Sequence, residues 1–374
     1  MKSDEISSFL NSRIEAGDFP SAVYLVAEKG KVVLSDAVGN AVVEPELIPA
    51  RPDTIYDLAS VTKVLVTSLM AAILLDSGEI SLDDQVSDLL PDFGAEDKRE
   101  ITVEQLLSHS SGLPAWKPLY LTAASADEIV TDINLTPLVP GQPSPTYSDL
   151  NFILLGAVIE RITGKTLDVA AKWKILVPLG TADTFFNPPP ELRPRIAASE
   201  NGNAFEKQTC VEKGFIAADD ERANSAFRTD TIWGEVHDGN AYFMGGVAGH
   251  AGLFSTADDV LKIAMQFLGD HSQLLTPETC NLFSANFTPD AAEHRSFGFQ
   301  LASTAESTAG TKMSPKSFGH LGFTGTSVWI DPDADRVFIL LTNRTHNRPL
   351  PFVLINSVRR HFHDLAIDSL DQNT

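Results

Sequence analysis

Three separated segments of the sequence carry residues that could together activate a serine. The first is Ser60-Val61-Thr62-Lys63, which stands at the start of a long apolar run. Residues three apart on a helix share a face, so the ammonium of Lys63 would lie about one turn from the Ser60 hydroxyl. Serine is a weak nucleophile at neutral pH and depends on a neighbouring base or cation. Alone the motif is a weak signal, because roughly one Ser-x-x-Lys match is expected by chance in a chain of this length.

Tyr147 is a candidate general base, and it stands just before a second apolar helix in the segment Pro145-Thr146-Tyr147-Ser148-Asp149. A tyrosine acts as a base only as phenolate, and its ordinary pKa is about 10. Working near pH 7 requires the pKa to fall by roughly three units, or about 4 kcal/mol, and a nearby ammonium supplies part of that. The alternative is a tyrosine that fastens a loop onto a helix, and spacing alone favours that alternative.

The third segment, Gly319–Gly325, is predicted to be a strand that contains His320 and Gly322. Its glycines would let a substrate or another backbone approach the strand edge closely. A backbone N–H from this strand, together with that of Ser60, would make an oxyanion hole, and losing one such donor typically costs about 2.7–4 kcal/mol. The alternative is a glycine-rich bend between two strands.

Length and charge limit the kind of protein these segments belong to. The chain has 374 residues, more than the usual limit of about 250–300 for one hydrophobic core. We therefore expect one catalytic unit made of two sub-domains, or two domains. The net charge of −22 argues against nucleic acid or an anionic membrane as a partner.

Targeting and redox signals are few. The N-terminus reads as an amphipathic helix without the apolar core of a signal peptide, and a cytoplasmic location is expected. The apolar run Val61–Leu75 is judged too short to cross a bilayer, and it contains Lys63. Cys210 and Cys280 are interpreted as two reduced thiols, and the alternatives are a disulfide or a metal pair.

Predicted strands lie at both ends of the chain and predicted helices between them. Hydrophobic periodicity predicts strands at 21–28, 32–38, 297–301, 317–322, 326–330 and 336–342, and helices at 3–16, 61–75, 148–163, 166–177, 255–268 and 349–366. A short helix after Thr102 has a capping-box start. Residues 187–245 show little periodicity and are expected to carry small structure of their own.

The fold class predicted from this order is α+β. The N-terminal hairpin and the C-terminal strands would share one antiparallel sheet, with the terminal helices on one face and the helical middle inserted as a lobe. The expected unit spans 1–374, with an α/β sub-domain of 1–59 and 291–374 and a mainly helical lobe of 60–290. A cleft between sheet and lobe would be the natural site.

The three segments, in this order, resemble the motifs of the serine β-lactamase and penicillin-recognising superfamily: Ser60-Val61-Thr62-Lys63, Tyr147-Ser148-Asp149 and His320-Leu321-Gly322. Within that superfamily the motifs are most similar to those of class C β-lactamases, D-alanyl-D-alanine carboxypeptidases, D-aminopeptidases and family VIII carboxylesterases. The segments 106–114 and 249–256 also resemble sequences of that family. The likeness extends from the strand at 21 to the helix at 349, and it implies a sheet with an all-α lobe.

The resemblance implies a role for each motif residue. Ser60 would be the nucleophile that forms an acyl-enzyme, and Lys63 and Tyr147 would form the base system. His320 and Gly322 would lie on the strand that flanks the substrate. The N–H groups of Ser60 and Phe323 would form the oxyanion hole.

Two motif positions depart from the class C pattern. The third motif usually begins with lysine and here begins with His320, whose ordinary pKa of about 6.5 leaves it mostly neutral at pH 7. The second motif usually ends in asparagine and here ends in Asp149, which cannot donate a hydrogen bond when ionised. Asp149 is kept as a substrate-binding candidate, and both departures argue against an efficient lactamase. The Trp-Gly-Gly that usually forms the third motif of family VIII esterases is absent there.

Other sites are less well supported by the sequence. No Gly-x-Ser-x-Gly elbow is present, which disfavours an α/β-hydrolase. His237, Asp238 and His250 lack a regular metal-ligand spacing and are interpreted as residues that organise loops. The segment 245–252 lacks the surroundings of a phosphate loop.

The sequence therefore predicts a serine hydrolase without metal or other cofactor, acting on a small-molecule ester or a D-amino-acid-type amide. The alternatives within enzymes are a D-Ala-D-Ala carboxypeptidase, a D-aminopeptidase or a weak β-lactamase. A non-catalytic ligand-sensing domain on the same fold is the alternative of another class. Neither a nucleic acid nor a membrane is expected as a partner, and the sequence leaves the oligomeric state open.

Overall fold

A seven-stranded antiparallel sheet joins the two ends of the chain. The computed structural model describes residues 2–140, 145–217, 220 and 225–371. The strand order is β3 (Ile48–Pro49), β2 (Lys31–Val42), β1 (Ser21–Glu28), β10 (Arg336–Thr342), β9 (Ser327–Asp331), β8 (Phe318–Leu321) and β7 (Gln300–Leu301). N-terminal β1 pairs with C-terminal β10 over its length, with Val23 opposite Leu341. The predicted sharing of one sheet by both termini is confirmed.

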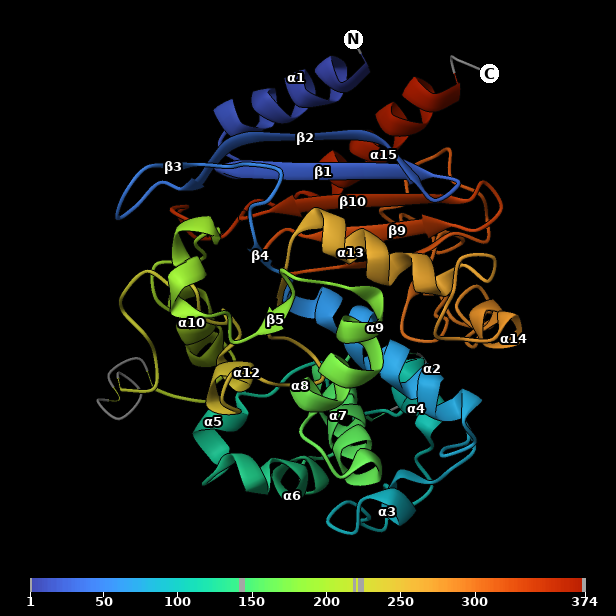
Figure 1. Cartoon of the computed structure of the whole chain (residues 1–374). Coiled ribbons are helices and arrows are strands. Elements are labelled where there is room, and N and C mark those ends of the chain that lie inside the picture. The colour runs from blue at the N-terminus through green and yellow to red at the C-terminus, as the bar shows by residue number, and fades with distance from the viewer. Residues whose placement is uncertain (1, 141–144, 218–219, 221–224, 372–374) are drawn as a thin grey trace.

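Both faces of the sheet are covered, as the apolar character of both faces of β1 requires. Tyr24 and its alternate neighbours face α1 (Lys2–Glu15) and α15 (Asn356–Asp371), which lie together on one face (Figure 1). Val23 and Leu25 face the larger core on the other side, where α13 (Ala257–Ala264) packs. The predicted α+β class, with terminal helices on one face of the sheet, is confirmed.

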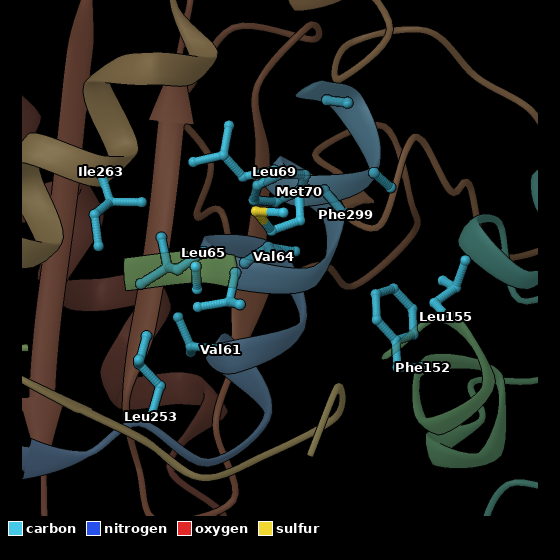
Figure 2. Close-up of a cluster of buried hydrophobic side chains, with 14 of the residues drawn as sticks. Val61, Val64, Leu65, Leu69, Met70, Phe152, Leu155, Leu253, Ile263 and Phe299 are labelled. Atoms are coloured by element: carbon cyan, nitrogen blue, oxygen red, sulfur yellow. The ribbon is translucent and has the colours of Figure 1, made fainter. Parts of the chain in front are cut away.

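The buried helix that begins near Ser60 runs through the centre of the larger core. It consists of a 3₁₀ turn (Ala59–Val61), a π-helical segment (Lys63–Ser68) and α2 (Leu69–Asp76). Side chains from α7 (Asp149–Thr163), α13 and β6 (Leu253–Ser255) surround it (Figure 2). The side chains labelled in Figure 2 are Val61, Val64, Leu65, Leu69, Met70, Phe152, Leu155, Leu253, Ile263 and Phe299.

This helix is longer than the predicted run Val61–Leu75. Over Ala59–Asp76 it is long and apolar enough to cross a membrane by length and composition, and 78% of that window is buried inside the fold. A mostly buried core helix can meet the same criteria of length and composition as a membrane-spanning helix. The helix predicted over 61–75 is present, but its first part, Lys63–Ser68, is π-helical rather than α-helical. Such π segments are frequent at functional sites.

The lobe is built from short elements around α7. The remaining short strands and helices of the chain are β4 (Tyr56–Asp57), α3 (Val86–Leu89), α4 (Val103–Leu107), α5 (Leu119–Thr122), α6 (Ile129–Asn134), α8 (Leu167–Ala171), α9 (Val177–Leu179), β5 (Phe185–Phe186), α10 (Ala204–Glu212), α12 (Gly239–Phe243) and α14 (Pro277–Asn281). The predicted capping box is present, because Thr102 and Gln105 bond each other's backbone. Strands β4, β6 and β5 form a small second antiparallel sheet.

Several predicted bounds differ from the structure. The last helix begins at Asn356 rather than at 349, because Leu350-Pro351 and the following residues form an irregular approach to it. The strand expected at 297–301 is only Gln300–Leu301. Cys210 and Cys280 are both buried free thiols, as predicted. The sub-domain boundaries at 59/60 and 290/291 stay a prediction.

Candidate active site

The turn that carries Ser60 is held in an unusual backbone conformation by its neighbours. Ala59 has a φ of +47°, a left-handed value that is rare for residues other than glycine. Its N–H donates to the carboxylate of Asp57 over 2.8 Å. From the segment after β8, the hydroxyls of Thr324 and Thr326 donate to the carbonyls of Asp57 and Leu58 over 2.8 and 2.9 Å. The nucleophile turn is therefore fastened directly to the strand that would flank a substrate.

Lys63 is fully buried, and all three directions of its ammonium are occupied. Its Nζ lies 2.9 Å from Ser60 Oγ, 2.7 Å from Asp149 Oδ1 and 3.0 Å from the carbonyl of His250. Burial opposes the charge, but Asp149 and Tyr147 outweigh it and hold the pKa of Lys63 above its ordinary value. Lys63 is therefore a cation in the resting site.

Tyr147 lies among four charged or aromatic groups. Its ring centroid is 5.1 Å from Lys63 Nζ and 5.3 Å from the guanidinium carbon of Arg295. The rings of His109 and His320 lie 4.7 and 5.8 Å from it. Burial raises the pKa of Tyr147 above its ordinary value, although Lys63 acts in the opposite direction. The resting side chain is therefore a neutral phenol.

His109 holds the segment that bears Tyr147. Its Nδ1 accepts from the backbone N–H of Ser148 over 3.0 Å, and its carbonyl accepts from the N–H of Thr146 over 2.9 Å. Its ring packs between Tyr147 and Phe152. Because Nδ1 accepts, the ring is neutral with its proton on Nε2. Burial, with Arg295 and Lys63, keeps the pKa of His109 well below its ordinary value.

His320 and Gly322 line the strand beside the Ser60 turn. Nδ1 of His320 lies 2.9 Å from the carbonyl of Leu321 and donates to it, which leaves Nε2 as an acceptor. Burial, then Lys63 and Arg295, keep the pKa of His320 well below its ordinary value, so the ring is neutral. At Gly322 a Cβ would lie 2.5 Å from the carbonyl oxygen of Leu58. Glycine is required there because the Ser60 turn packs directly against the strand.

The expected oxyanion donors are free to bind a ligand. Within the described ranges, the backbone N–H groups of Ser60 and Phe323 have no protein acceptor. Phe323 follows directly on Gly322, where the strand leaves the sheet and meets the nucleophile turn. Unpaired N–H groups beside a nucleophile suit the negative oxygen of a tetrahedral intermediate.

These residues surround one cavity of about 680 Å³. Ser60, Tyr147, Asp149, His320, Gly322 and Phe323 all line it, and Lys63 lies buried behind Ser60. The structure thus brings together every site residue named from the sequence. The cavity lining also includes Phe205, Glu206, His237, Asp238, Arg295 and Gln300.

Sequence reasoning missed the direct contact between Asp149 and Lys63. It treated Asp149 as a group that would face the substrate, yet one carboxylate oxygen binds the ammonium at 2.7 Å. A spacing argument could have found it, because Asp149 begins α7 two residues after Tyr147. Asp149 also lines the cavity, so substrate contact stays a prediction.

Arg295 is a second residue that the sequence did not reveal. It is buried, pairs with Glu293 at 2.6 Å and lies over the ring of Tyr147. It belongs to an irregular segment before β7, where no periodic pattern identifies it.

The histidines that were interpreted as organising loops do so in the structure. His250 Nε2 lies 2.9 Å from the carboxylate of Asp238, which also caps α12. The backbone N–H of His237 donates to the second oxygen of Asp57 over 2.8 Å. Through these bonds the loop before α12 supports the Ser60 turn. Among the described residues no group of three or more potential ligands is arranged for a metal ion.

The sequence profile of the Beta-lactamase family matches residues 6–356. The chain belongs to the Beta-lactamase family. This beta-lactamase-family chain is 32% identical over 374 residues to a protein of Escherichia coli K12 named "Putative D-alanyl-D-alanine carboxypeptidase", covering 92% of this chain and 82% of the relative. A Salmonella typhi protein of the same name is 33% identical over 376 residues, with coverage of 92% and 83%.

Solved structures share the fold of this beta-lactamase-family chain. A penicillin-binding protein homologue from Caulobacter crescentus has a TM-score of 0.73 at 22% identity, covering 98% of this chain and 97% of that one. A class C beta-lactamase from Rhodobacter sphaeroides has a TM-score of 0.71 at 20% identity, with coverage of 98% and 99%. EstCE1, described as a hydrolase with promiscuous acyltransferase activity, has a TM-score of 0.72 at 20% identity and 97% coverage of each chain. The protein is a hydrolase of the beta-lactamase superfamily.

Proposed function

We propose that the protein is a serine hydrolase that forms an acyl-enzyme on Ser60 and hydrolyses small esters or D-amino-acid-type amides. The observation that carries the proposal is the 2.9 Å contact between Ser60 Oγ and the buried ammonium of Lys63, at the wall of a 680 Å³ cavity. A buried lysine held beside a serine in an accessible cavity has no purpose in packing, because burying its charge is costly. It serves the reactivity of Ser60.

Acylation begins with attack of Ser60 Oγ on the substrate carbonyl carbon. The proton of Ser60 passes to the group formed by Tyr147 and Lys63, and the carbonyl oxygen becomes negative beside the N–H groups of Ser60 and Phe323. The tetrahedral intermediate then expels an alkoxide or amine, which takes the proton. In the second half of the reaction a water molecule gives its proton to the same group and attacks the acyl-enzyme carbonyl. The bond to Ser60 Oγ then breaks, Ser60 regains its proton and the acid is released.

The reactive form of this group has one proton fewer than the resting form. In the resting site Lys63 is a cation and Tyr147 a phenol, and the pKa of each lies above its ordinary value. Losing that proton therefore becomes easier as the pH rises. We expect kcat/KM to increase toward alkaline pH, because only the deprotonated group can accept the Ser60 proton.

A D-Ala-D-Ala carboxypeptidase is the second candidate, and Arg295 favours it. This buried guanidinium lines the cavity beside Tyr147; one of its amino groups pairs with Glu293, and its Nε, which has no hydrogen-bond partner among the described residues, would bind a terminal carboxylate. The name of the Escherichia coli relative points in the same direction. A weak lactamase is the third candidate. It ranks below the other two because neutral His320 and acidic Asp149 stand where class C enzymes usually have lysine and asparagine.

A substrate panel tests the proposal. Purified protein and Ser60→Ala are assayed with p-nitrophenyl butyrate, D-alanine p-nitroanilide, a D-Ala-D-Ala peptide and nitrocefin. We expect turnover of the ester or the D-anilide by the wild type alone. Preferred release of D-alanine from the peptide would assign the second candidate. Absence of turnover with all four, in folded protein, would favour a non-catalytic sensing domain.

A further inference from the structure

Glu206, on α10, is a buried acidic group in the wall of the Ser60 cavity. Only 8% of the residue is exposed. One carboxylate oxygen accepts from the backbone N–H of Gly239 over 2.8 Å, and the other accepts from the hydroxyl of Tyr120 over 3.1 Å. It forms no ion pair with any lysine, arginine or histidine that the structure describes.

The other acidic groups of this wall have cationic or histidine partners. Asp238 faces His250 at 2.9 Å, Asp149 faces Lys63 at 2.7 Å, and Glu293 faces Arg295 at 2.6 Å. Glu206 is the neighbour that lacks one. A buried carboxylate without an ion-pair partner is costly. Burial, and then Asp238, raise the pKa of Glu206 to about 7, although His237 and the hydrogen bond from Gly239 act in the opposite direction. An ammonium that entered the cavity would remove this cost.

Two further groups show that the cavity is built for a polar ligand. Nε2 of His320 and Nε of Arg295 are buried, and neither has a hydrogen-bond partner among the described residues. Both residues line the same cavity as Ser60 and Glu206. Unpartnered buried polar atoms of this kind are rare in folded proteins and call for an occupant.

Glu206 lies on the side of the cavity near Phe323, the expected oxyanion donor that follows strand β8. Its neighbour Phe205 packs against Phe323 with ring centroids 4.8 Å apart, and His237 stacks on Phe323 at 5.5 Å. Figure 1 shows α10, α12 and α5, which supply Glu206, Gly239 and Tyr120, grouped at one side of the lobe. A carbonyl held at Phe323 would thus have an apolar surface beside it and a carboxylate next to that surface.

We propose that Glu206 is an ammonium-binding subsite, so that the preferred substrates carry a free primary amine on the acyl group. The inference rests on the acyl-enzyme function proposed above. It names the substrate class as aminoacyl esters and amides. Glu206 acts through binding and takes no part in proton transfer at Ser60.

The test compares substrates with and without the amine. The p-nitroanilides of D-alanine, 4-aminobutyric acid and 6-aminohexanoic acid are each assayed against the N-acetylated compound, so that three chain lengths cover the reach of Glu206. A charge-assisted hydrogen bond predicts that wild type favours the free amine by about tenfold to a hundredfold in kcat/KM for at least one length. The readout is the ratio within each pair, because general damage to catalysis lowers both members.

Glu206→Gln is the informative variant, and Glu212→Gln is its control. Glu212 is exposed on the same helix and bonds Gln208, so its replacement removes the same charge outside the cavity. We expect the ratio to fall to near one in Glu206→Gln and to persist in Glu212→Gln. Equal ratios in wild type and Glu206→Gln would overturn the proposal, as would a wild-type ratio near one at all three lengths.

A second measurement needs no variant. Butylamine and 1-butanol are compared as inhibitors of p-nitrophenyl butyrate turnover by the wild type, and we expect the amine to inhibit at about tenfold lower concentration. Equal inhibition would overturn the subsite. Loss of all turnover together with loss of fluorophosphonate labelling at Ser60 would instead contradict the proposed function, so the two failures are distinguishable.

Discussion

Replacing Asp149 by asparagine should move the acidic limb of the pH–rate profile to lower pH. Asp149 lies 2.7 Å from Lys63 Nζ, and its negative charge raises the pKa of both Lys63 and Tyr147. Whichever of the two gives up the proton, removing that charge makes the deprotonated form easier to reach. The direction of the shift therefore does not depend on which residue is the base.

The size of the shift follows from Coulomb's law. The nearer oxygen of Asp149 lies 2.7 Å from Lys63 Nζ, and two unit charges about 4 Å apart in an effective dielectric of about 20 interact by roughly 4 kcal/mol. Since 1.36 kcal/mol corresponds to one pKa unit, the limb should move by up to about three units. The asparagine oxygen still accepts from Lys63, which reduces the loss of stability below the 3–5 kcal/mol that is typical for breaking a buried ion pair.

The assay is kcat/KM for p-nitrophenyl butyrate over a pH series, with folding checked by circular dichroism at each pH. Asp92→Asn is the matched control, because it removes the same charge from an exposed position. We expect Asp92→Asn to keep the wild-type profile. An acidic limb that stays in place, or moves to higher pH, in folded Asp149→Asn would refute the assigned role of Asp149.

Three other substitutions test the site. Tyr147→Phe removes the phenol beside Lys63 and should lower kcat by about 10²–10⁴-fold in steady-state ester hydrolysis; a kcat within twofold of wild type would leave Tyr147 only a packing role. His320→Lys places a charge beside Tyr147 and should move the acidic limb to lower pH by about one unit, whereas an unchanged profile would assign His320 to packing. Gly322→Ala puts a Cβ 2.5 Å from the Leu58 carbonyl and should lower kcat/KM by displacing the Ser60 turn; wild-type activity would contradict the close approach.

The sequence predicted the overall architecture because its signals were local and strong. Strand β1 is apolar on both faces, and α7 is a long apolar helix that ends at Thr163 and is capped by Gly164, so both elements were predicted within a residue or two. The sharing of one sheet by both termini followed from the element order alone. The motif residues meet in one cavity because they stand at the ends of these well-predicted elements.

The features that the sequence did not reveal depend on tertiary contacts. The left-handed φ of Ala59 is imposed by Asp57 and by threonines from the segment after β8, far away in the chain. The π-helical segment from Lys63 has the same apolar pattern as a regular helix. Arg295 and Glu206 lie in stretches with little periodicity, and only the fold brings them to the cavity. Part of the expected small structure in 187–245 lies outside the described residues.

Mass spectrometry after treatment with a fluorophosphonate probe tests the central claim most directly. The wild-type protein should gain the mass of one phosphonyl adduct, located at Ser60 by peptide mapping, because Lys63 lies 2.9 Å from the Ser60 oxygen and makes it reactive. Ser60→Ala should gain no mass under the same conditions. A wild-type protein that is folded and stays unlabelled, or that is labelled at another residue, would contradict the assignment of Ser60 as the nucleophile.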